Sequence, residues 1–432
     1  MSRTMKNSGI PWIGEIPSHW AIQRLQTQLF EINEKNSPIK TDFVLSLTNT
    51  RGVIPYTEKG DIGNKSKDNH EEYKIAYPNT IVANSMNILI GSVGICNYYG
   101  CVSPVYYIFK ERNEAVLRFF NYLLSCQPFQ KHLRQYANGI LEIRLRLSCK
   151  DILQRSVPVP SSPEQQAIAD FLDKKCDEID EMVSLQEKII EELKAYKQSV
   201  ITEAVCKGLN PDVPMKDSGI EWIGQIPEGW CITRLRNLGN TQNGISQGGD
   251  YFGEGFPFVS YSDVYKNYSL PNDVKGLAKS NEKEQELFSV KSGDIFFTRT
   301  SETIEEIGFS SVCLETIPKA VFAGFLIRFR PNSNALNTLY AKYYFRSDIH
   351  RAYFVKEMNI VIRASLSQDL LKSLPVILPS QQEQQEIGEY LEKRCAEIDT
   401  LISVRLSKID ALKEYKKSII YEYITGKKEV NG

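Results

Sequence analysis

Two long segments of the chain repeat apolar residues at helical spacing. Between Pro163 and Gly208 there is no further proline or glycine, and the serines just before Pro163 can cap a first turn in which proline costs no hydrogen bond. A second segment, from Glu383 to about Thr425, has the same apolar spacing. Each segment predicts one helix of about 43 residues, or roughly 64 Å at 1.5 Å per residue.

A heptad assignment gives each predicted helix a broad apolar seam, which is unfavourable in water. Because the seams of the two segments correspond, we expect the helices to pack on each other. Antiparallel packing is favoured, since a loop-rich domain can return the chain to the other end of the pair; parallel packing is the alternative. The residues expected to pair the helices are Leu172, Ile179, Met182, Ile189, Leu193, Tyr196, Leu391, Ile398, Leu401, Leu412 and Tyr415. Cys176, Val183 and Ile190 widen the first seam.

The stretch before each helix has a different pattern, with short apolar runs separated by polar turns. In the first stretch this pattern predicts strands at residues 43–47, 80–83 and 105–109 and a helix at 115–125. In the second it predicts strands at residues 290–297 and 325–329. The expected fold class is α+β, with two mixed α/β domains separated by two long antiparallel helices.

The borders of these stretches occur twice. Residues 8–20 return as 218–230, and residues 160–180 return as 379–399, which indicates an internal duplication with pseudo-two-fold symmetry. We expect a first domain at residues 1–157, a long helix within 158–209, a second domain at 210–378 and a second long helix within 379–432. The Trp-Ile-Gly-x-Ile-Pro segments are interpreted as loops that anchor each domain. The alternative is that Trp12, Trp20, Trp222 and Trp230 dock a partner.

The composition is that of an ordinary globular protein. Of the 432 residues, 42% are hydrophobic and 24% are charged, and no apolar run approaches the roughly 18 residues of a membrane span. The polar start lacks the apolar core of a signal peptide, so we expect a cytoplasmic protein that does not bind membranes. Nine cysteines without a Cys-x-x-Cys pair and four scattered histidines favour neither a disulfide framework nor a metal site.

Familiar catalytic motifs do not occur in the sequence. It contains no Gly-x-x-x-x-Gly-Lys-Ser/Thr loop and no His-Glu-x-x-His pair. The glycines of residues 252–255 lack the preceding apolar run and the following helix of a nucleotide-binding loop. We therefore expect this chain to bind no cofactor and to have no enzymatic activity of its own. An enzyme with an unfamiliar site is the alternative, and it would be active as a purified chain without partners.

Polar turns in both interiors combine amide side chains with cations, and these groups read base edges and bind phosphates in protein–DNA complexes. A net charge of −1 argues against a simple basic coat, so DNA binding would depend on such local sets. The candidates are Arg51, Lys65, Lys67, Asn84, Asn87 and Arg144 in the first domain, and Gln242, Asn243, Gln247, Arg299 and Arg363 in the second. Ordinary surface turns are the alternative, and Arg144 and Arg363 could equally form structural ion pairs.

The order of these features resembles the specificity subunits of type I restriction–modification systems. The matching residues are Trp12-Ile13-Gly14 with Ile16-Pro17, and Pro158-Val159-Pro160 followed by Glu164-Gln165, together with their second copies. Within the first interior, Asn84-Ser85-Met86-Asn87 and Val102-Ser103-Pro104-Val105-Tyr106 look like one class of target-recognition domain. The second interior, with Gly293-Asp294-Ile295, looks like another class.

This resemblance implies that each domain reads one half of an asymmetric, bipartite site in double-stranded DNA, and that the paired helices set the unread spacer. It also implies docking to two methyltransferase subunits that carry S-adenosylmethionine, and to restriction subunits that use ATP and Mg2+. The chain itself would be a non-catalytic subunit. A coiled-coil scaffold that displays two interaction domains without binding DNA is the rival hypothesis.

Overall fold

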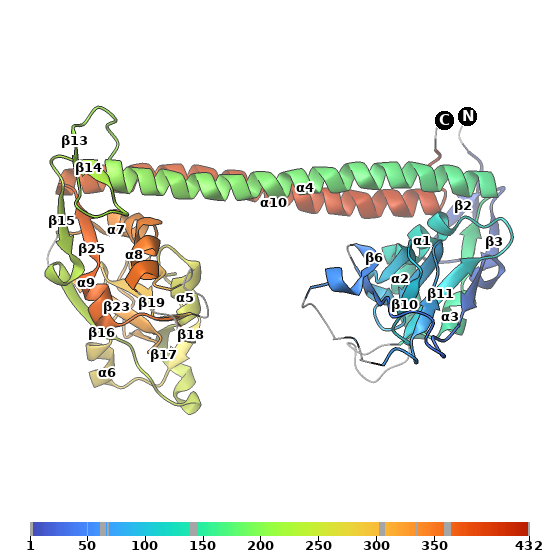
Figure 1. Cartoon of the computed structure of the whole chain (residues 1–432), viewed down its shortest axis with the longest axis horizontal. Helices are drawn as coiled ribbons and strands as arrows, with labels where there is room; N and C mark the ends of the chain where they lie inside the picture. The colour runs from blue at the N-terminus through green and yellow to red at the C-terminus, as the bar shows by residue number, and fades with distance from the viewer. Residues whose placement is uncertain are drawn as a thin grey trace. The chain divides into compact units, whose positions relative to one another are not determined.

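The computed structural model describes residues 3–49, 51–60, 66, 69–137, 146–301, 307–332, 335–357 and 364–430. The chain divides into two compact units. Unit 1 comprises Met1–Glu187 with Ser407–Gly432, and unit 2 comprises Lys188–Leu406. Each unit holds one mixed α/β domain together with part of both long helices, which confirms the expected fold class (Figure 1).

Both long helices are present, as α4 (Ser162–Lys207) and α10 (Gln381–Ile424). In unit 1, Nζ of Lys416 on α10 lies 2.6 Å from a carboxylate oxygen of Asp180 on α4. Farther toward the start of α4, the ring of Phe171 lies 4.3 Å from the ring of Tyr423. Residue numbers therefore rise along one helix where they fall along the other, so the two helices are antiparallel in this unit.

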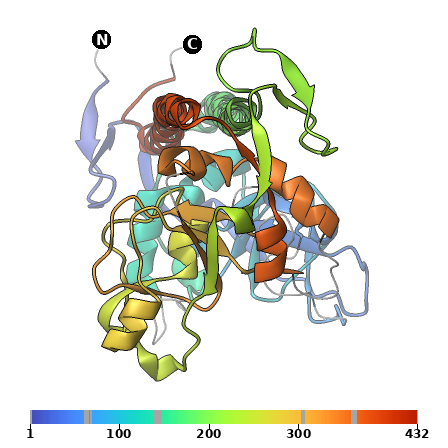
Figure 2. The same cartoon turned by 90° about the vertical axis from the view of Figure 1, so that its left-hand side faces the viewer.

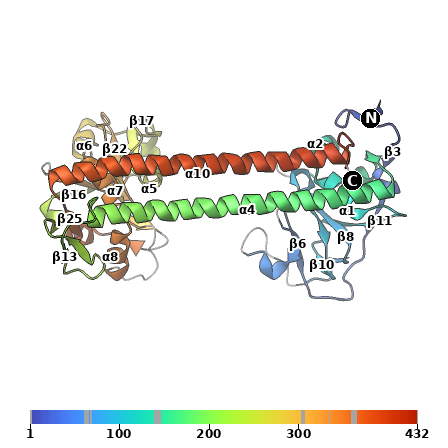
Figure 3. The ribbon, with the colours of Figure 1, turned by 90° about the horizontal axis from the view of Figure 1, so that it is seen from above.

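The same ion pair recurs in unit 2, with the two helices exchanging roles. Nζ of Lys197 on α4 lies 2.6 Å from a carboxylate oxygen of Asp399 on α10. Lys197 and Lys416 are equivalent positions of the duplication, 219 residues apart (416 − 197), and Asp180 and Asp399 are separated by the same 219 residues (399 − 180). The parts of α4 and α10 that belong to unit 2 also lie side by side in Figure 3.

The buried seam of the helix pair includes four of the eleven residues expected to pair the helices, namely Leu172, Ile179, Leu391 and Ile398. Met182, Tyr196, Leu401 and Tyr415 are between 42% and 54% exposed. Ile189, Leu193 and Leu412 are half-buried. Further buried side chains include Cys176 and Ile190 on α4, and Cys395, Ile409 and Ile419 on α10. Residues 182 and 183 are both apolar, as are 189 and 190, so two heptad frames fit the sequence and packing selects the frame through Cys176 and Ile190.

The domain of unit 1 is built on a four-stranded antiparallel sheet with the order β4-β11-β8-β9. These strands are β4 (Leu29–Ile32), β8 (Thr80–Asn84), β9 (Val93–Cys96) and β11 (Tyr106–Glu111). Helices α1 (Leu117–Ser125) and α2 (Gln127–Leu133) share a core with one sheet face and with the long helices. The other face packs on β5 (Leu45–Thr48), β6 (Gly52–Pro55), β7 (Lys74–Ala76) and β10 (Gly100–Val102).

Unit 2 contains a sheet of the same order, β16-β23-β19-β21. Its strands are β16 (Gly239–Asn243), β19 (Ile295–Thr298), β21 (Ser310–Val312) and β23 (Leu326–Pro331). One face packs on α7 (Thr338–Tyr344), α8 (Ile349–Glu357) and the long helices. Figure 2 turns this unit toward the viewer, with the long helices seen end-on beside the domain. The two domains hardly resemble each other in sequence, yet each is built on its own four-stranded sheet with the same strand order.

The other sheet face of unit 2 carries a different second layer from that of unit 1. This layer consists of β17 (Phe252–Val259), β18 (Gly276–Ala278), β22 (Val321–Phe322), α5 (Tyr261–Lys266) and α6 (Glu282–Leu287). Its core joins Val259 and Val264 to Phe296 and Leu326 of the sheet. Sheets of the same strand order are thus covered by different second layers in the two units.

The remaining strands frame each domain in the same way. In unit 1 they are β1 (Met5–Asn7) with β2 (Glu15–Pro17), and β3 (Ala21–Arg24) with β12 (Ser156–Val159). In unit 2 they are β13 (Met215–Asp217) with β14 (Gln225–Pro227), and β15 (Cys231–Arg234) with β25 (Pro375–Leu378). The short strands β20 (Thr300–Ser301) and β24 (Ala364–Ser365) pair in unit 2, and the short helices α3 (Cys149–Leu153) and α9 (Gln368–Ser373) complete the two domains.

The repeated tryptophans anchor each domain to the start of its own long helix. Trp20 Nε1 donates a hydrogen bond to Glu164 Oε1 at 3.2 Å, and Trp230 Nε1 donates to Glu383 Oε1 at 2.9 Å. Both rings are fully buried. Burial alone would raise the pKa of Glu164, but hydrogen bonds led by that from His19 outweigh it and lower the pKa to about 2. These contacts support the anchoring interpretation of the repeated segments.

Neighbouring glutamines complete the anchor. Gln165 Nε2 donates to the carbonyl oxygen of Pro160, and its Oε1 accepts from the backbone N–H of Val116, just before α1. In unit 2 Gln384 makes the same two bonds, to Pro379 and from Asn337, just before α7. The repeated Pro-Ser-x-x-Glu-Gln sequence is therefore explained by the junction of helix and domain. Among the described residues, neither the long nor the short helices have the length and apolar character that a membrane span requires.

Candidate nucleic-acid interface

Two loops that sequence composition singles out occupy the same place in the two sheets. The loop Asn84–Asn87 leaves the end of β8, and Arg299, which joins β19 to the short strand β20, leaves the end of β19. Because both strands are third in their sheets, the two loops emerge at corresponding edges.

Backbone hydrogen bonds define the correspondence residue by residue. In unit 1 the N–H of Ser85 donates to Val105 O at 3.3 Å, and Ser85 O accepts from the N–H of Leu147. In unit 2 the N–H of Arg299 donates to Phe325 O at 2.9 Å, and Arg299 O accepts from the N–H of Leu366. Ser85 and Arg299 are therefore equivalent, as are Val105 and Phe325.

A cavity of about 650 Å³ lies beside the loop in unit 1. Three of the candidate residues, Arg51, Asn84 and Asn87, line it together with the rings of Tyr56 and Tyr106. Asn84 is only 6% exposed, and its Oδ1 accepts a hydrogen bond from the N–H of Met86. Its Nδ2 donates no hydrogen bond to another described residue, so this group is left to donate to a ligand.

Arg51, which lines this cavity, forms a surface ion pair. Its Nη2 lies 2.6 Å from Glu58 Oε2, and both side chains are at least half exposed. Exposed ion pairs contribute little stability, so a phosphate could replace Glu58 at low cost. Lys65, Lys67, Arg144 and Arg363 lie outside the described residues, although Arg144 and Arg363 precede the equivalent positions Leu147 and Leu366 in the sequence.

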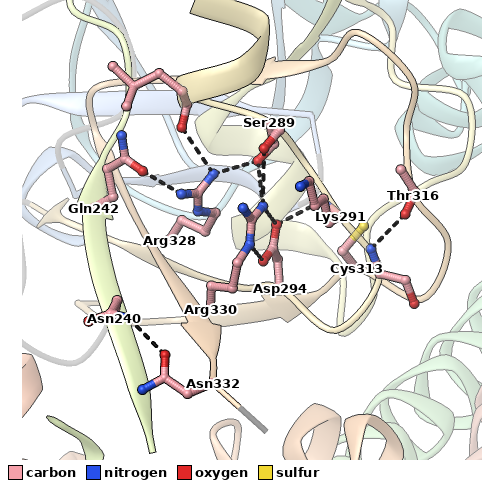
Figure 4. A network of polar contacts seen from close by, with 12 residues as sticks. Asn240, Gln242, Ser289, Lys291, Asp294, Cys313, Thr316, Arg328, Arg330 and Asn332 are labelled. Atoms are coloured by element: carbon pink, nitrogen blue, oxygen red, sulfur yellow. Dashed lines mark hydrogen bonds and ion pairs between the residues drawn. The ribbon is translucent and has the colours of Figure 1, made fainter.

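In unit 2, Gln242 on β16 belongs to a polar network on the sheet (Figure 4). Its Oε1 accepts a hydrogen bond from Arg328 Nη2, and Arg328 Nη1 donates to Ser289 O at 2.6 Å. Beside it, Arg330 forms a bidentate ion pair with Asp294 at 2.6 Å. Because its oxygen is occupied, Gln242 presents its Nε2 as a hydrogen-bond donor.

Arg328 is the residue of this network that sequence reasoning missed. It is 6% exposed, and burial, with a smaller contribution from the neighbouring charge of Arg330, lowers its pKa to about 10. The guanidinium also lies 5.3 Å from the ring centroid of Phe322. In the sequence, the two arginines alternate with Ile327 and Phe329, which resembles a strand with one solvent-facing side. The second layer of unit 2 covers that side.

The other candidates of unit 2 lie on two neighbouring segments. Asn243 ends β16, and its Oδ1 is buried without a hydrogen-bond partner among the described residues. Gln247 is exposed in the loop that follows, and Arg299 is half-buried. Both segments bond to the turn before β23: the N–H of Gly324 donates to Ile245 O at 2.7 Å, and that turn also binds the N–H of Arg299.

Exposed apolar residues recur at equivalent places on the helix pair. On one helix Met182 and Leu185 are three residues apart, which places them on one face, and their repeat equivalents are Leu401 and Val404. Because Lys416 contacts Asp180, Tyr415 lies at the level of Met182 in unit 1. The ion pair of Lys197 with Asp399 likewise places Tyr196 at the level of Leu401 in unit 2. Each unit therefore has exposed apolar side chains at equivalent positions of the helix pair, and these two sets are called the apolar patches.

Unit 2 also contains a cavity of about 1270 Å³ at the end of α4. Trp222, Tyr196 and Tyr390 line it together with the turn that follows Gly208. Docking of a partner therefore stays a prediction for Trp222, whereas burial assigns Trp20 and Trp230 to anchoring.

Comparison with known proteins gives a family match over most of the chain. The model described as "Type I restriction modification DNA specificity domain" matches residues 17–195 and again residues 227–411. The two matches coincide with the two copies of the duplicated frame, each with its domain and most of its long helix.

Curated relatives carry related descriptions. The chain is 26% identical over 263 residues to the type I restriction enzyme EcoBI specificity subunit of Escherichia coli, covering 59% of this chain and 54% of that protein. It is 28% identical over 254 residues to the EcoKI specificity subunit of Escherichia coli strain K12, covering 57% and 52%. The aligned part thus spans about half the length of these two relatives. The MjaVIII specificity subunit of Methanocaldococcus jannaschii is 23% identical over 429 residues, covering 95% and 93%.

Solved structures with the same fold cover nearly the whole chain. One, from work on complex assembly and conformational transition of the type I R-M system, has a TM-score of 0.72 at 13% identity, covering 95% of this chain and 98% of its own. The HsdS subunit from Thermoanaerobacter tengcongensis has a TM-score of 0.53 at 13% identity with the same coverage. At this level of sequence identity, the likeness shows a common fold and nothing more.

Proposed function

The chain belongs to the family defined by the type I restriction modification DNA specificity domain, and we propose that it is the sequence-reading subunit of a type I restriction–modification complex. Each unit reads one half of an asymmetric, bipartite site in double-stranded DNA. The observation that carries this proposal is that equivalent loops, at the ends of β8 and β19, bear different hydrogen-bonding side chains. Equal frames with unequal loops are what two different half-sites require.

Side-chain chemistry suggests how each unit reads bases. Asparagine pairs in bidentate fashion with the N6 and N7 edge of adenine, and arginine pairs with O6 and N7 of guanine. Asn87 therefore favours adenine in the half-site of unit 1, Asn84 adds a single donor through its Nδ2 because its Oδ1 is bonded to Met86, and Arg299 favours guanine in the half-site of unit 2. Arg51 and Lys65 are proposed to hold phosphates, which fix the register of the first domain on DNA without reading sequence.

The helix pair sets the unread spacer in this proposal. The repeated ion pair of Lys416 with Asp180, and of Lys197 with Asp399, supports a fixed register of α4 on α10 within each unit. The two similar apolar patches support docking of two like partners, one to each unit, because exposed apolar groups on a helix favour a protein contact. These partners are proposed to be methyltransferase subunits.

Bond-making steps belong to the partners and not to this chain in the proposed complex. The methyltransferase subunits carry S-adenosylmethionine, and restriction subunits use ATP and Mg2+. The chain binds no cofactor, has no activity of its own and works in the cytoplasm beside the DNA. Support for this division of labour comes from the family, whose model describes DNA specificity.

Mapping of methylated adenines in host DNA tests the proposal. In cells that carry the gene, methylation at one bipartite motif should disappear when the gene is deleted and return when it is restored. Methylation that persists without the gene would contradict the proposal. Binding of DNA by the purified complex provides a second test. If the complex makes about 6 to 10 phosphate contacts, raising the salt concentration from 50 to 200 mM should weaken its DNA binding by roughly 10³- to 10⁵-fold. The rival scaffold would show no salt-dependent DNA affinity.

Removal of one heptad from both helices tests the proposed spacing. Each helix should shorten by about 10 Å, since an α-helix rises 1.5 Å per residue. The methylated motif should keep both half-site sequences and change its spacer. An unchanged spacer in a variant that still methylates DNA would contradict the role of the helices.

A further inference from the structure

Phe325 is an exception within the most apolar run of the chain. Every other residue from Ala320 to Phe329 is buried, whereas Phe325 is 63% exposed. It lies in the turn between β22 and β23, beside the fully buried Leu326. A large aromatic side chain in this position is unfavourable in water, so its exposure calls for a physical reason.

The backbone of this turn is fixed from two sides. The N–H of Gly324 donates to Ile245 O at 2.7 Å, and Ile245 N–H donates to Phe322 O at 2.9 Å. On the other side, the N–H of Arg299 donates to Phe325 O at 2.9 Å. The turn is therefore tied to both polar segments of unit 2, and its backbone cannot turn to carry Phe325 inward without breaking these bonds.

Two glycines permit the close approach of these segments. A Cβ atom on Gly324 would lie 2.9 Å from the backbone oxygen of Ile245, and a Cβ on Gly244 would lie 2.2 Å from that of Ala323. Neither distance is compatible with a side chain, so only glycine fits at both positions. The glycines at positions 244 and 324 thus permit the backbone packing that keeps Phe325 on the surface.

The surroundings of Phe325 indicate what the ring meets. Gln242, Asn243 and Gln247 lie on the segment that binds the turn from one side, and Arg299 binds it from the other. An apolar side chain between groups that hydrogen-bond base edges is the arrangement with which proteins unstack a base step. We propose that Phe325 is a wedge that stacks on, and partly opens, one base step in the DNA half-site of unit 2. This inference rests on the proposed function.

Unit 1 provides an internal contrast. The backbone position of Phe325 is occupied there by Val105, which is half-buried and lines the cavity beside Asn84. A branched aliphatic side chain cannot stack on a base as an aromatic ring does. The proposal therefore locates the distortion in one half-site only, the one read by unit 2.

A fluorescent base analogue tests the wedge. The full chain, with its methyltransferase partners, is bound to duplexes that carry the mapped motif with 2-aminopurine placed at one step at a time in either half. The wild type should raise the fluorescence at one step of the unit 2 half-site, and Phe325→Ala should abolish that signal and weaken specific binding about 10-fold or more. Phe325→Trp should retain the signal, and Leu287→Ala, which truncates a side chain 58% exposed in the same unit, should behave as wild type.

The outcomes separate the wedge from the function on which it rests. If the wild type has no site-specific DNA binding, the proposed function fails and the wedge with it. If the wild type binds its motif and Phe325→Ala binds equally well with the same fluorescence, the wedge alone is overturned. If Phe325→Ala loses a protein partner and keeps its DNA affinity, the ring is a protein contact, which also overturns the wedge. The melting temperature should not change, because the ring is exposed.

Discussion

The two units fill the same strand positions with opposite chemistry. In unit 1, Ile108 of β11 lies opposite Ile32 of β4, in an apolar core. In unit 2 the corresponding positions hold Arg328 opposite Gln242. The third strand completes the correspondence, because Val82 lies opposite Ile108 and Phe296 lies opposite Arg328. One sheet geometry therefore accepts an aliphatic pair or a buried cation with an amide, provided that the layer above it changes as well.

This difference separates the support of each domain from its reading surface. The anchors at Glu164 and Glu383 and the ion pairs on α4 and α10 are repeated almost unchanged. By contrast, the layer over the sheet and the loops at its edge differ between the units. Such a division allows the target of one unit to change without disturbing the frame.

The largest expected effect comes from the aliphatic pair of unit 1. Ile108→Ala should destabilise this unit by about 2–5 kcal/mol, because the side chain is fully buried and its loss leaves a cavity. Thermal unfolding should measure the loss of stability, and hydrogen exchange of the backbone amides should locate it in unit 1. Ile108→Val, expected to cost only about 0.5–1.5 kcal/mol, is the matched control. Equal effects of the two variants would contradict close packing at this position.

Arg328→Met tests the position in unit 2 that corresponds to Ile108 in unit 1, and it should affect DNA reading as well as stability. Methionine fills a similar volume, but loss of the guanidinium removes a donor from the acceptors Ser289 O and Gln242 Oε1, so the free energy of unfolding should fall by about 1–3 kcal/mol. Gln242 would lose the partner that orients its amide, and discrimination at one base of that half-site should fall by about 1–3 kcal/mol. Binding to single-base variants of the motif measures this. If discrimination survives while stability falls, Arg328 is merely structural.

The two anchors should differ in strength near neutral pH, and both should weaken in acid, because the pKa of each glutamate is lowered. Because the folded pKa of Glu164 is about 2, against an ordinary value of 4.5, its stabilisation is present above about pH 4.5 and is lost as the pH falls toward 2. Glu164→Gln should cost about 1 kcal/mol at pH 7, and the gap to wild type should close in acid. Glu383→Gln should cost less, because the side chain of Glu383 accepts fewer hydrogen bonds than that of Glu164. A gap that is independent of pH would contradict the charged anchor.

The smallest effects are expected at the repeated ion pairs. Lys416→Ala in unit 1 and Lys197→Ala in unit 2 should each cost about 0.2–1 kcal/mol, since their carboxylate partners are more than half exposed. Both losses should shrink in high salt. The exchange of charges in Asp180→Lys with Lys416→Asp should restore stability. A large effect in only one unit would show that the two parts of the helix pair are not equivalent.

Sequence patterns predicted the parts of the fold that depend on local periodicity. The long helices follow from the uninterrupted apolar spacing after Pro163, and several short strands lie close to their expected ranges. The frame of the helix seam was less accessible, because adjacent apolar positions such as Met182 and Val183 suit two heptad frames. The shared sheet was hidden, because Ile32 and Gln242 are unlike residues at one structural position.

Part of the candidate interface also followed from composition. The loops at Asn84 and Arg299 were predicted from their polar side chains, but their equivalence depends on strand pairing between residues far apart in the chain. The role of Arg328 was not predicted, because its burial depends on the second layer of unit 2, and no local sequence pattern indicates where that layer packs. The individual DNA contacts stay predictions.

Exchange of one domain interior tests the independence of the two units most directly. Residues 21–157 would be replaced by the corresponding interior of a relative that reads a known motif, and methylated adenines would then be mapped across the genome. The account predicts a motif in which one half-site takes the new sequence while the other half-site and the spacer stay as they were. A change in both half-sites, or in neither while methylation continues, would contradict two separate readers on a common helical frame.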